Sequence, residues 1–138
     1  MNQEIITLIT LVVDDNPLFR KVITEILSSN FPFMEIIEAG NAKEALQTFA
    51  DRRPPLIFMD IRLPDLNGLE VTREIKTIDP GTAVVIVTNH DTAEYRDTAE
   101  EYGADDFISK TSSIAEEIQR TVHSIPCIRD ELGQNSRG

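Results

Sequence analysis

The sequence predicts an α/β fold with one doubly wound parallel sheet of five strands and five helices. Short apolar runs alternate with amphipathic stretches along the chain, which is the order expected of repeated βα units. Several of these runs are continuously apolar, as in strands that helices cover on both faces. Polar residues follow the runs directly, at the strand ends where α/β sheets hold ligands.

The first expected strand, residues 6–13, is followed by a helix that extends to about residue 29. Pro17 favours the start of this helix, because the fixed φ of proline fits the first helical turn. Apolar side chains then recur at helical spacing and predict a buried face. The residues expected on that face are Leu18, Val22, Ile26 and Leu27.

A second strand is expected at residues 35–38, and a second helix follows Asn41. Asn41 is a favourable N-cap, and Glu44 three residues later resembles the acidic partner in a capping box. The dipeptide at residues 54–55, Pro-Pro, ends this helix because residues before proline avoid the helical conformation. The third strand, residues 56–60, follows directly.

The third expected helix begins at Leu66 or Asn67 and ends at the Asp-Pro-Gly turn of residues 79–81. A fourth strand is expected at residues 83–87, whose continuous Ala, Val and Ile residues suit a buried strand. Gly103 can adopt the left-handed conformation that ends a helix. The apolar face of the third helix is expected to contain Leu69, Ile75 and Ile78. The remaining elements are expected at residues 91–102 (helix), 106–109 (strand) and 114–125 (helix, stopped by Pro126).

Length and composition indicate one globular domain at residues 1–125, followed by a polar tail or linker stub at 126–138. The net charge of −11 opposes binding to nucleic-acid phosphates, so no direct nucleic-acid contact is expected. No apolar run approaches the roughly 20 residues that span a bilayer, so no membrane contact is expected either. The single cysteine, Cys127, and the absence of a secretory signal favour the cytoplasm.

Five polar side chains lie at or just after the expected strand ends. Parallel strands bring these ends to one edge of the sheet. Three carboxylates close together repel one another unless a hard cation lies among them, so the sequence predicts a Mg²⁺ site. The five residues are Asp14 and Asp15 after the first strand, Asp60 at the end of the third, Thr88 after the fourth and Lys110 after the fifth.

The same side chains suit phosphoryl transfer, which depends mostly on positioning and charge neutralisation. Asp60 can attack phosphorus and form an aspartyl phosphate. Asp15 and Asp60 can bind Mg²⁺ directly, and Asp14 can bind it through water. Lys110 can pair with Asp60 and then with a phosphoryl oxygen. Thr88 can donate a hydrogen bond to another phosphoryl oxygen.

These residues resemble the receiver domain of bacterial two-component response regulators, over roughly residues 5–125. The segment at residues 107–111, Phe-Ile-Ser-Lys-Thr, resembles more narrowly the receivers that are joined to helix-turn-helix DNA-binding domains. All five site positions hold the residue type that the family has. The matching segments are Val-Val-Asp-Asp at 12–15, Met-Asp at 59–60, Pro-Asp-Leu-Asn-Gly at 64–68, Val-Thr at 87–88 and Gly-Ala-Asp-Asp-Phe-Ile-Ser-Lys at 103–110.

The resemblance implies the flavodoxin-like strand order 2-1-3-4-5 and a phospho-accepting signalling domain rather than an enzyme. Asp60 would receive the phosphoryl group from a histidine kinase or a phosphotransfer protein. Autophosphorylation and autodephosphorylation would both depend on Mg²⁺. The backbone carbonyl of Arg62, two residues after the acceptor, would be a further metal ligand.

Phe107 lies three residues before Lys110, at the position of the family's switch aromatic. The resemblance implies that a phosphoryl group draws the Thr88 hydroxyl inward and leaves room for the Phe107 ring to rotate. This rotation would change the surface formed by the fourth helix, fifth strand and fifth helix, and so control a partner or an output domain. A homodimer through that surface is also expected, with the acidic fourth helix facing Arg120 of a second copy.

Two features depart from the family pattern. Lys110 is followed by Thr111 rather than proline, so we expect a trans peptide bond there. Asn89 is bulkier than the small residue that usually follows the threonine, and it narrows access to the phosphoryl group. Arg62 and His90 flank the path of the hydrolytic water in the family. We therefore predict that these three side chains tune the lifetime of the phosphorylated state.

Three other functions fit the sequence less well. A phosphatase of the haloacid dehalogenase class needs a second Asp two residues after its nucleophile, where this chain has Arg62. A flavin-binding module of the same fold needs Gly, Ser and Thr after the first strand, whereas residues 14–17 are Asp-Asp-Asn-Pro. A receiver-like domain that only binds partners usually lacks the acceptor Asp or the Lys, and both Asp60 and Lys110 are present.

Overall fold

The computed structural model describes residues 7–126 and contains one parallel sheet with the strand order β2-β1-β3-β4-β5. This order and the strict alternation of strands and helices confirm the predicted fold. The strands are β1 (Leu8–Val13), β2 (Met34–Ala39), β3 (Leu56–Met59), β4 (Ala83–Thr88) and β5 (Asp106–Ser109). The helices are α1 (Pro17–Asn30), α2 (Ala42–Arg52), α3 (Gly68–Ile78), α4 (Ala93–Glu101) and α5 (Ile114–Ser124).

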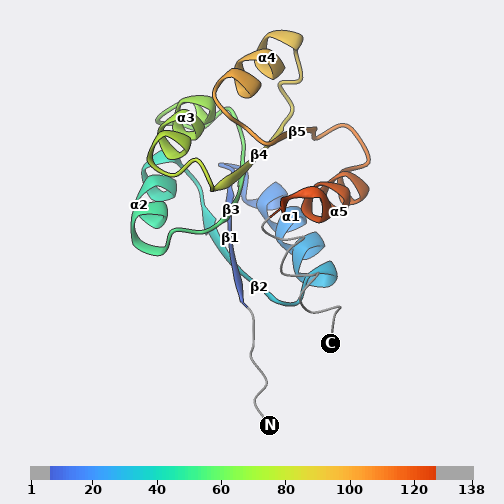
Figure 1. Ribbon diagram of the computed structural model, residues 1–138. Coiled ribbons are helices and arrows are strands. Elements are labelled where there is room, and N and C mark those ends of the chain that lie inside the picture. Colours follow the sequence, from blue (N-terminus) through green and yellow to red (C-terminus); the bar gives the residue numbers. More distant parts are fainter. Residues whose placement is uncertain (1–6, 127–138) are drawn as a thin grey trace.

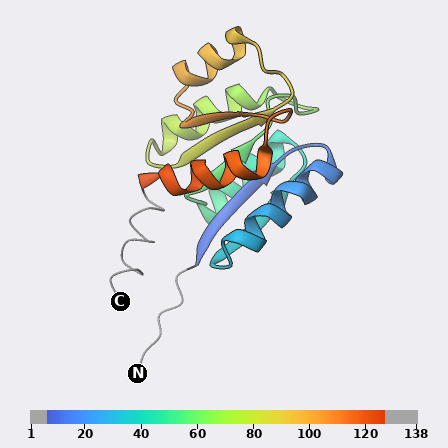
Figure 2. The ribbon, with the colours of Figure 1, turned by 90° about the vertical axis from the view of Figure 1, so that its right-hand side faces the viewer.

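Helices cover both faces of the sheet (Figure 1). The side chains of α1 and α5 pack on one face, and those of α2, α3 and α4 pack on the other. Figure 2 shows α5 and α1 lying side by side in front of the sheet. Every residue of β3 and β4 is buried, which explains why these strands are continuously apolar in the sequence.

The face that α1 turns to the core differs from the predicted one. Ile23 and Leu27 are buried, whereas Leu18 is 76% exposed and Val22 is 41% exposed. Successive residues of a helix are rotated by about 100°, so the stripe containing Phe19, Ile23 and Leu27 lies beside the stripe of Leu18 and Val22. Ile26 packs partly against the core beside Leu27, as predicted, but the prediction for Leu18 and Val22 was wrong.

Smaller differences from the predicted elements have local causes. Helix α4 begins at Ala93 because Thr92 is its N-cap, with Thr92 Oγ1 accepting a hydrogen bond from the Tyr95 amide at 3.2 Å. Ile78, at the last turn of α3, is 53% exposed instead of buried. The predicted tail at 126–138, with Cys127, lies outside the described residues apart from Pro126. Among the residues from 7 to 126, no helix is both long and apolar enough to cross a bilayer.

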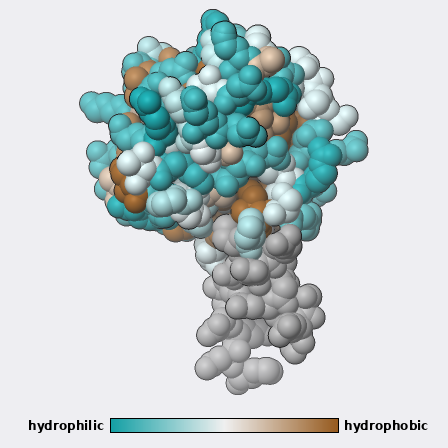
Figure 3. All heavy atoms as spheres, turned by 45° about the horizontal axis from the view of Figure 1, so that its top comes forward, coloured by the Kyte–Doolittle hydropathy of each residue, from teal (hydrophilic) through white to brown (hydrophobic). Residues whose placement is uncertain are grey.

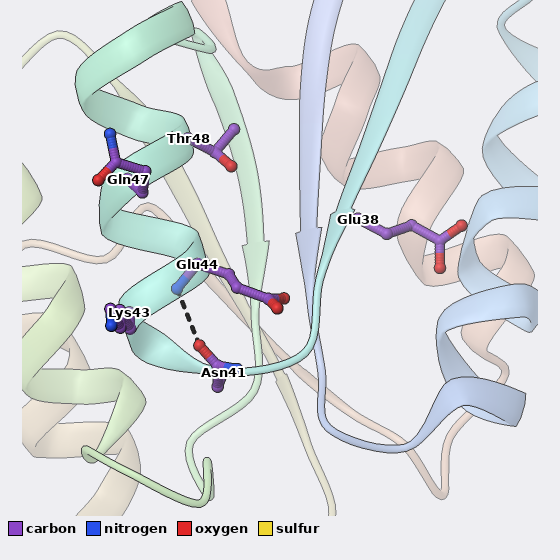
Figure 4. Close-up of a pocket in the computed structure, with 6 residues that line it drawn as sticks. All are labelled: Glu38, Asn41, Lys43, Glu44, Gln47 and Thr48. Atoms are coloured by element: carbon purple, nitrogen blue, oxygen red, sulfur yellow. Dashed lines mark hydrogen bonds between the residues drawn. The ribbon is translucent and has the colours of Figure 1, made fainter.

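The start of α2 is capped as the sequence predicts (Figure 4). Asn41 Oδ1 accepts a hydrogen bond from the Glu44 amide at 2.8 Å, and Glu44 Oε1 accepts one from the Gly40 amide at 2.9 Å. These reciprocal bonds satisfy amides that a helix N-terminus would otherwise leave without partners.

Asp65, in the loop between β3 and α3, caps the same helix from outside. Its Oδ1 accepts a hydrogen bond from the Ala42 amide at 2.8 Å, and its Oδ2 accepts one from the Lys43 amide at 3.0 Å. The Ala42 and Lys43 hydrogen bonds lower the pKa of Asp65, because they stabilise the charged carboxylate. The β3–α3 loop is thereby attached to the N-terminus of α2.

Helix α4 is held to the sheet by little apolar burial. Of its nine residues only Ala99 is buried. Its C-terminus is followed by Gly103, whose φ of 96° lies in the left-handed region as predicted. Tyr95 and Tyr102 are partly buried against the core beneath α2, α3 and α4.

Gly68 lies against the backbone of Asp60. A Cβ atom at this position would lie 1.9 Å from the Asp60 carbonyl oxygen and 2.9 Å from its carbonyl carbon. The Gly68 amide also donates a hydrogen bond to the Ile61 carbonyl at 2.6 Å. The first residue of α3 therefore has to be glycine for the chain to pass this closely behind the end of β3.

We predict that Gly68→Ala destabilises the fold by about 1–3 kcal/mol, because the added methyl group can be accommodated only by moving backbone. The measurement is the free energy of unfolding in urea. Gly81→Ala is the matched control. Its Cβ would meet only the Asp79 side chain, at 3.3 Å, in an exposed turn. Equal unfolding free energies for the two variants would contradict the prediction.

Candidate functional site

The register of the sheet brings the predicted site residues to one edge. Val13 pairs with Met59, so Asp14 and Asp60 leave neighbouring strands at the same level. The Asp60 amide continues the ladder by donating to the Val13 carbonyl at 3.0 Å. Just after β5, the Lys110 amide likewise extends the pairing of β4 with β5 by donating a hydrogen bond to the Thr88 carbonyl at 2.9 Å.

Lys110 bridges two of the three predicted carboxylates. Its Nζ lies 2.8 Å from Asp14 Oδ2 and 3.0 Å from Asp60 Oδ2. The Lys110 side chain is only 8% exposed, and the Asp14 and Asp60 side chains are buried. These ion pairs are therefore shielded from solvent, unlike pairs on the protein surface.

The Asp14 carboxylate is incompletely satisfied. Its Oδ1 accepts a hydrogen bond from the Asn16 amide at 2.9 Å. Its Oδ2 lies close to Lys110 Nζ, but off the direction of a hydrogen bond, and accepts none among the described residues. Burial raises the pKa of Asp14, and the contacts with Lys110 and Asn16 offset this effect only in part.

The pKa of Lys110 is raised. Burial alone would lower it, but the close contacts with the Asp14 and Asp60 carboxylates together outweigh burial. Lys110 therefore remains an ammonium group at neutral pH. A fixed positive charge at this position is what the predicted binding of a phosphoryl oxygen requires.

Asp14, Asp15 and Asp60 fit a hard divalent cation. One oxygen from each can be chosen so that all three lie within 4.8 Å of one another. All three donors are carboxylate oxygens, which Mg²⁺ prefers, and Asp14 Oδ2 accepts no hydrogen bond from any residue between 7 and 126. When all are ionised, three carboxylates against one ammonium leave two negative charges, which one divalent cation would balance.

Thr88 and Phe107 lie on the same face of the sheet. Thr88 is fully buried and pairs with Ser109, so Phe107 is its diagonal neighbour on β5. Thr88 Oγ1 accepts a hydrogen bond from the His90 amide at 3.2 Å. Its hydroxyl hydrogen donates to no acceptor within the part of the chain that the structure describes.

The half-buried Phe107 ring lies beneath a guanidinium group. Arg96 Cζ is 4.5 Å from the centroid of the ring, within the range of a cation–π contact. Arg96 Nε also pairs with Asp91 Oδ1 at 2.6 Å, and this hydrogen bond lowers the pKa of Asp91. Sequence reasoning missed Arg96, because nothing in the sequence indicates which residue of α4 faces β5.

The three residues predicted to tune the phosphoryl lifetime lie around the site without bonding to Asp60. Arg62 and Asn89 are exposed. The His90 ring packs edge-on against Tyr95, with centroids 6.3 Å apart. Tyr95 and Arg62 both line a surface hollow of about 370 Å³. Neither hydrogen bonds nor ion pairs join these three to the Asp60 carboxylate in the described residues.

Two neighbours of the site were not predicted. Arg20 Nη1 donates a hydrogen bond to the Asp14 carbonyl at 2.6 Å, and its Nε pairs with Glu38 at 2.9 Å. Phe19 places its ring 4.2 Å from Lys110 Nζ, measured to the ring centroid. Phe19 lies four residues before Ile23 and therefore on the same side of α1. This spacing could have predicted from the sequence that Phe19 faces the core.

Local geometry confirms one further expectation, whereas the homodimer through Arg120 stays a prediction. The peptide bond between Lys110 and Thr111 is trans, as predicted. Arg120 pairs with Glu117 of its own helix, and its side chain is 67% exposed. The face shown in Figure 3 is largely hydrophilic, with small and separate hydrophobic patches.

A surface hollow of about 590 Å³ beside the start of α2 contains none of the site carboxylates (Figure 4). The hollow is open to solvent, and its lining residues are all of polar or charged type, among them the capping residues of α2. It therefore offers no enclosed apolar site of the kind that usually binds a small molecule. The lining residues are Glu38, Asn41, Lys43, Glu44, Gln47 and Thr48.

Comparisons with known proteins agree with this geometry. The family model described as "Response regulator receiver domain" matches residues 10–122. The chain is 36% identical over 100 residues to the chemotaxis protein CheY of Halobacterium salinarum, covering 72% of this chain and 82% of that protein. It is 32% identical over 110 residues to the probable transcriptional regulatory protein TcrX of Mycobacterium tuberculosis, covering 80% of this chain.

The chain spans less than half of TcrX, 46% of its length. Among solved structures, the receiver domain of NtrX from Brucella abortus superposes with a TM-score of 0.74 at 35% identity. That match covers 83% of this chain and 98% of the NtrX domain. The sequence match, the sheet topology and the neighbouring solved structure agree, and the chain belongs to the family of response regulator receiver domains.

Proposed function

We propose that this receiver domain accepts a phosphoryl group on Asp60 from a histidine kinase or a phosphotransfer protein in the cytoplasm. The observation that carries the proposal is the bridge from Lys110 Nζ to Asp14 Oδ2 and Asp60 Oδ2. It joins the proposed acceptor to a fixed cation at the edge where the strands end. The domain would signal through its own phosphorylation and would not act on a separate substrate.

The transfer is a displacement at phosphorus. One Asp60 carboxylate oxygen forms the new bond to phosphorus, and the bond from phosphorus to the donor breaks, with its electron pair leaving on the donor. Lys110 pairs with Asp60 beforehand and is positioned to neutralise a phosphoryl oxygen. The Thr88 hydroxyl is proposed to donate a hydrogen bond to a second phosphoryl oxygen.

Mg²⁺ is the cofactor that the site residues suit. We propose Asp15 and Asp60 as direct ligands, Asp14 as a ligand through water and the Arg62 backbone carbonyl as a further ligand. When bound, Mg²⁺ neutralises charge on the phosphoryl oxygens. The hydrogen bonds that Asp65 makes to α2 hold the loop that contains Arg62.

The proposed output is a change in the surface formed by α4, β5 and α5. Movement of the Thr88 hydroxyl toward the phosphoryl group would make room for Phe107, its diagonal neighbour on the sheet. The same surface is proposed to form a homodimer or to contact an output domain. An output domain that binds DNA is supported by the name of TcrX, a probable transcriptional regulatory protein of which this chain spans 46%.

Incubation with acetyl phosphate and Mg²⁺ should add the mass of one phosphoryl group to the intact protein. Asp60→Asn and a wild-type sample with EDTA should show no gain, because each removes a part that the transfer needs. The phosphorylated sample should also sediment as a dimer and show a shifted Phe107 ring signal in NMR spectra. An equal mass gain in Asp60→Asn would exclude Asp60 as the acceptor.

Asp14→Asn should raise the free energy of unfolding, by on the order of 1 kcal/mol, at pH 7 without divalent cations, because one ammonium cannot compensate three carboxylates and Asp60 remains paired with Lys110. The raised pKa of Asp14 means that the folded state binds this proton more tightly than the unfolded state does. The carboxylate therefore destabilises the fold above its unfolded pKa of about 3.8, and the gain should shrink as the pH is lowered toward 4.

Urea denaturation in EDTA at several pH values measures this effect, with Asp97→Asn on the exposed surface of α4 as the control. A destabilised Asp14→Asn protein at pH 7, or a gain independent of pH, would be inconsistent with a costly buried charge. Mg²⁺ titration of the same variant should show weaker binding than wild type.

Arg62→Ala and His90→Ala should each speed the loss of the phosphoryl group by about three- to tenfold, the effect expected of one interaction at the reacting centre. We propose that each side chain flanks the path that water takes to Asp60, so that removing it opens this path. Loss of the phosphoryl mass over time, after removal of acetyl phosphate, measures the rate. Arg52→Ala, an exposed arginine at the end of α2, is the matched control, and unchanged rates for both test variants would refute the tuning role.

A further inference from the structure

Phe19 lies against the ammonium group that bridges the two buried carboxylates. We propose that Phe19 is a positioning residue, whose ring face holds Lys110 Nζ in place for phosphoryl transfer. The inference rests on the proposed function and identifies a side chain through which that function is controlled. The contact joins the first turn of α1 to the residue after β5, which are more than 90 positions apart in the chain.

The geometry is that of a cation–π contact. Lys110 Nζ lies 4.2 Å from the centroid of the Phe19 ring, inside the roughly 6 Å range of such contacts. Two carboxylate oxygens already lie within 3.0 Å of the same nitrogen. The aromatic ring covers a further side of the ammonium, which agrees with the low exposure of the Lys110 side chain, 8%. Contacts between an ammonium and a ring are stronger when water is excluded in this way.

Phe19 is itself held by the turn that contains Asp14. Asp14 Oδ1 accepts the Asn16 amide hydrogen at 2.9 Å. Asn16 Oδ1 then accepts the amide hydrogens of Leu18 at 3.0 Å and Phe19 at 3.3 Å. The ring packs against the apolar core shared by α1 and α5. One hydrogen-bonded turn therefore fixes both a proposed metal-binding carboxylate and the ring.

A restraint on Lys110 matters because lysine is a flexible side chain with many rotamers. A lysine free to swing toward solvent would have to be ordered before it could neutralise a phosphoryl oxygen. With the ring on one side and the carboxylates on the other, the ammonium is already placed where the phosphoryl group would arrive. Preorganised charge of this kind lowers the barrier to transfer.

Progressive fluorination of the Phe19 ring tests the proposal. Mono-, di- and trifluorophenylalanine at position 19 reduce the negative charge of the ring face while keeping nearly the same size and apolar character. The measured quantity is the rate constant for phosphoryl mass gain from acetyl phosphate with Mg²⁺. We expect it to fall stepwise with each fluorine, by about two- to fivefold over the series, and to be lowest for Phe19→Leu.

Leu18→Ala is the matched control, because Leu18 is the adjacent residue of the same turn and is 76% exposed. Its rate constant should equal that of wild type. The thermal unfolding midpoint of each fluorinated variant shows whether the fold is retained. A rate constant that does not change across the folded series would overturn the proposal, because a ring that only fills space is insensitive to its surface charge.

A second measurement separates this inference from the proposed function. The ring current of Phe19 should shift the proton signals of the Lys110 ε-methylene group upfield in NMR spectra, and Phe19→Leu should remove that shift. If the shift is absent in wild type, the Phe19 ring does not contact Lys110 in solution, and the inference fails whether or not the protein is phosphorylated. If the shift is present but wild type gains no phosphoryl mass, the proposed function fails and the positioning role fails with it.

Discussion

The electrostatic balance around Lys110 is the interaction on which the site depends. Burying the Asp14 and Asp60 carboxylates costs free energy unless a charge of opposite sign compensates them. Lys110 compensates them incompletely, since three acidic groups lie at this edge and Asp14 Oδ2 accepts no directed hydrogen bond. The excess of buried negative charge opposes folding, and the proposed Mg²⁺ would offset this cost, as is common at functional sites.

The rest of the fold fixes the backbone around these charges. The pairing of Val13 with Met59 sets the level at which the two carboxylates leave the sheet. Behind Asp60, the lack of a side chain at Gly68 lets α3 approach closely. Arg20, on α1, donates a hydrogen bond to the Asp14 carbonyl. Each of these contacts involves main-chain atoms, so their effect is to keep the loops at the site in one conformation.

Features that depend on neighbouring residues or on the family resemblance could be predicted from the sequence, including the pairing of Lys110 with Asp60. Contacts between distant segments that the resemblance does not imply could not. The strand order, the Asn41 cap and the placement of Asp14 and Lys110 at strand ends follow from periodicity, turn chemistry and family resemblance. By contrast, Asp65 reaches its partners in α2 across more than 20 residues, and no local pattern indicates that pairing. The exposed Leu18 shows a related limit, because apolar spacing alone does not decide which of two adjacent helical stripes packs inward.

The weak attachment of α4, with Ala99 as its one buried residue, has a consequence for motion. The free energy needed to detach an element scales with the apolar contacts it loses, so α4 requires less than a helix such as α3, where five residues are buried. Its backbone amides should therefore exchange with deuterium through local opening, well before the sheet unfolds. This least stable helix lies between the loop after Thr88 and the strand that contains Phe107. The surface proposed to carry the signal thus contains the helix that has the fewest buried residues among the five described, and we expect it to rearrange without unfolding of the sheet.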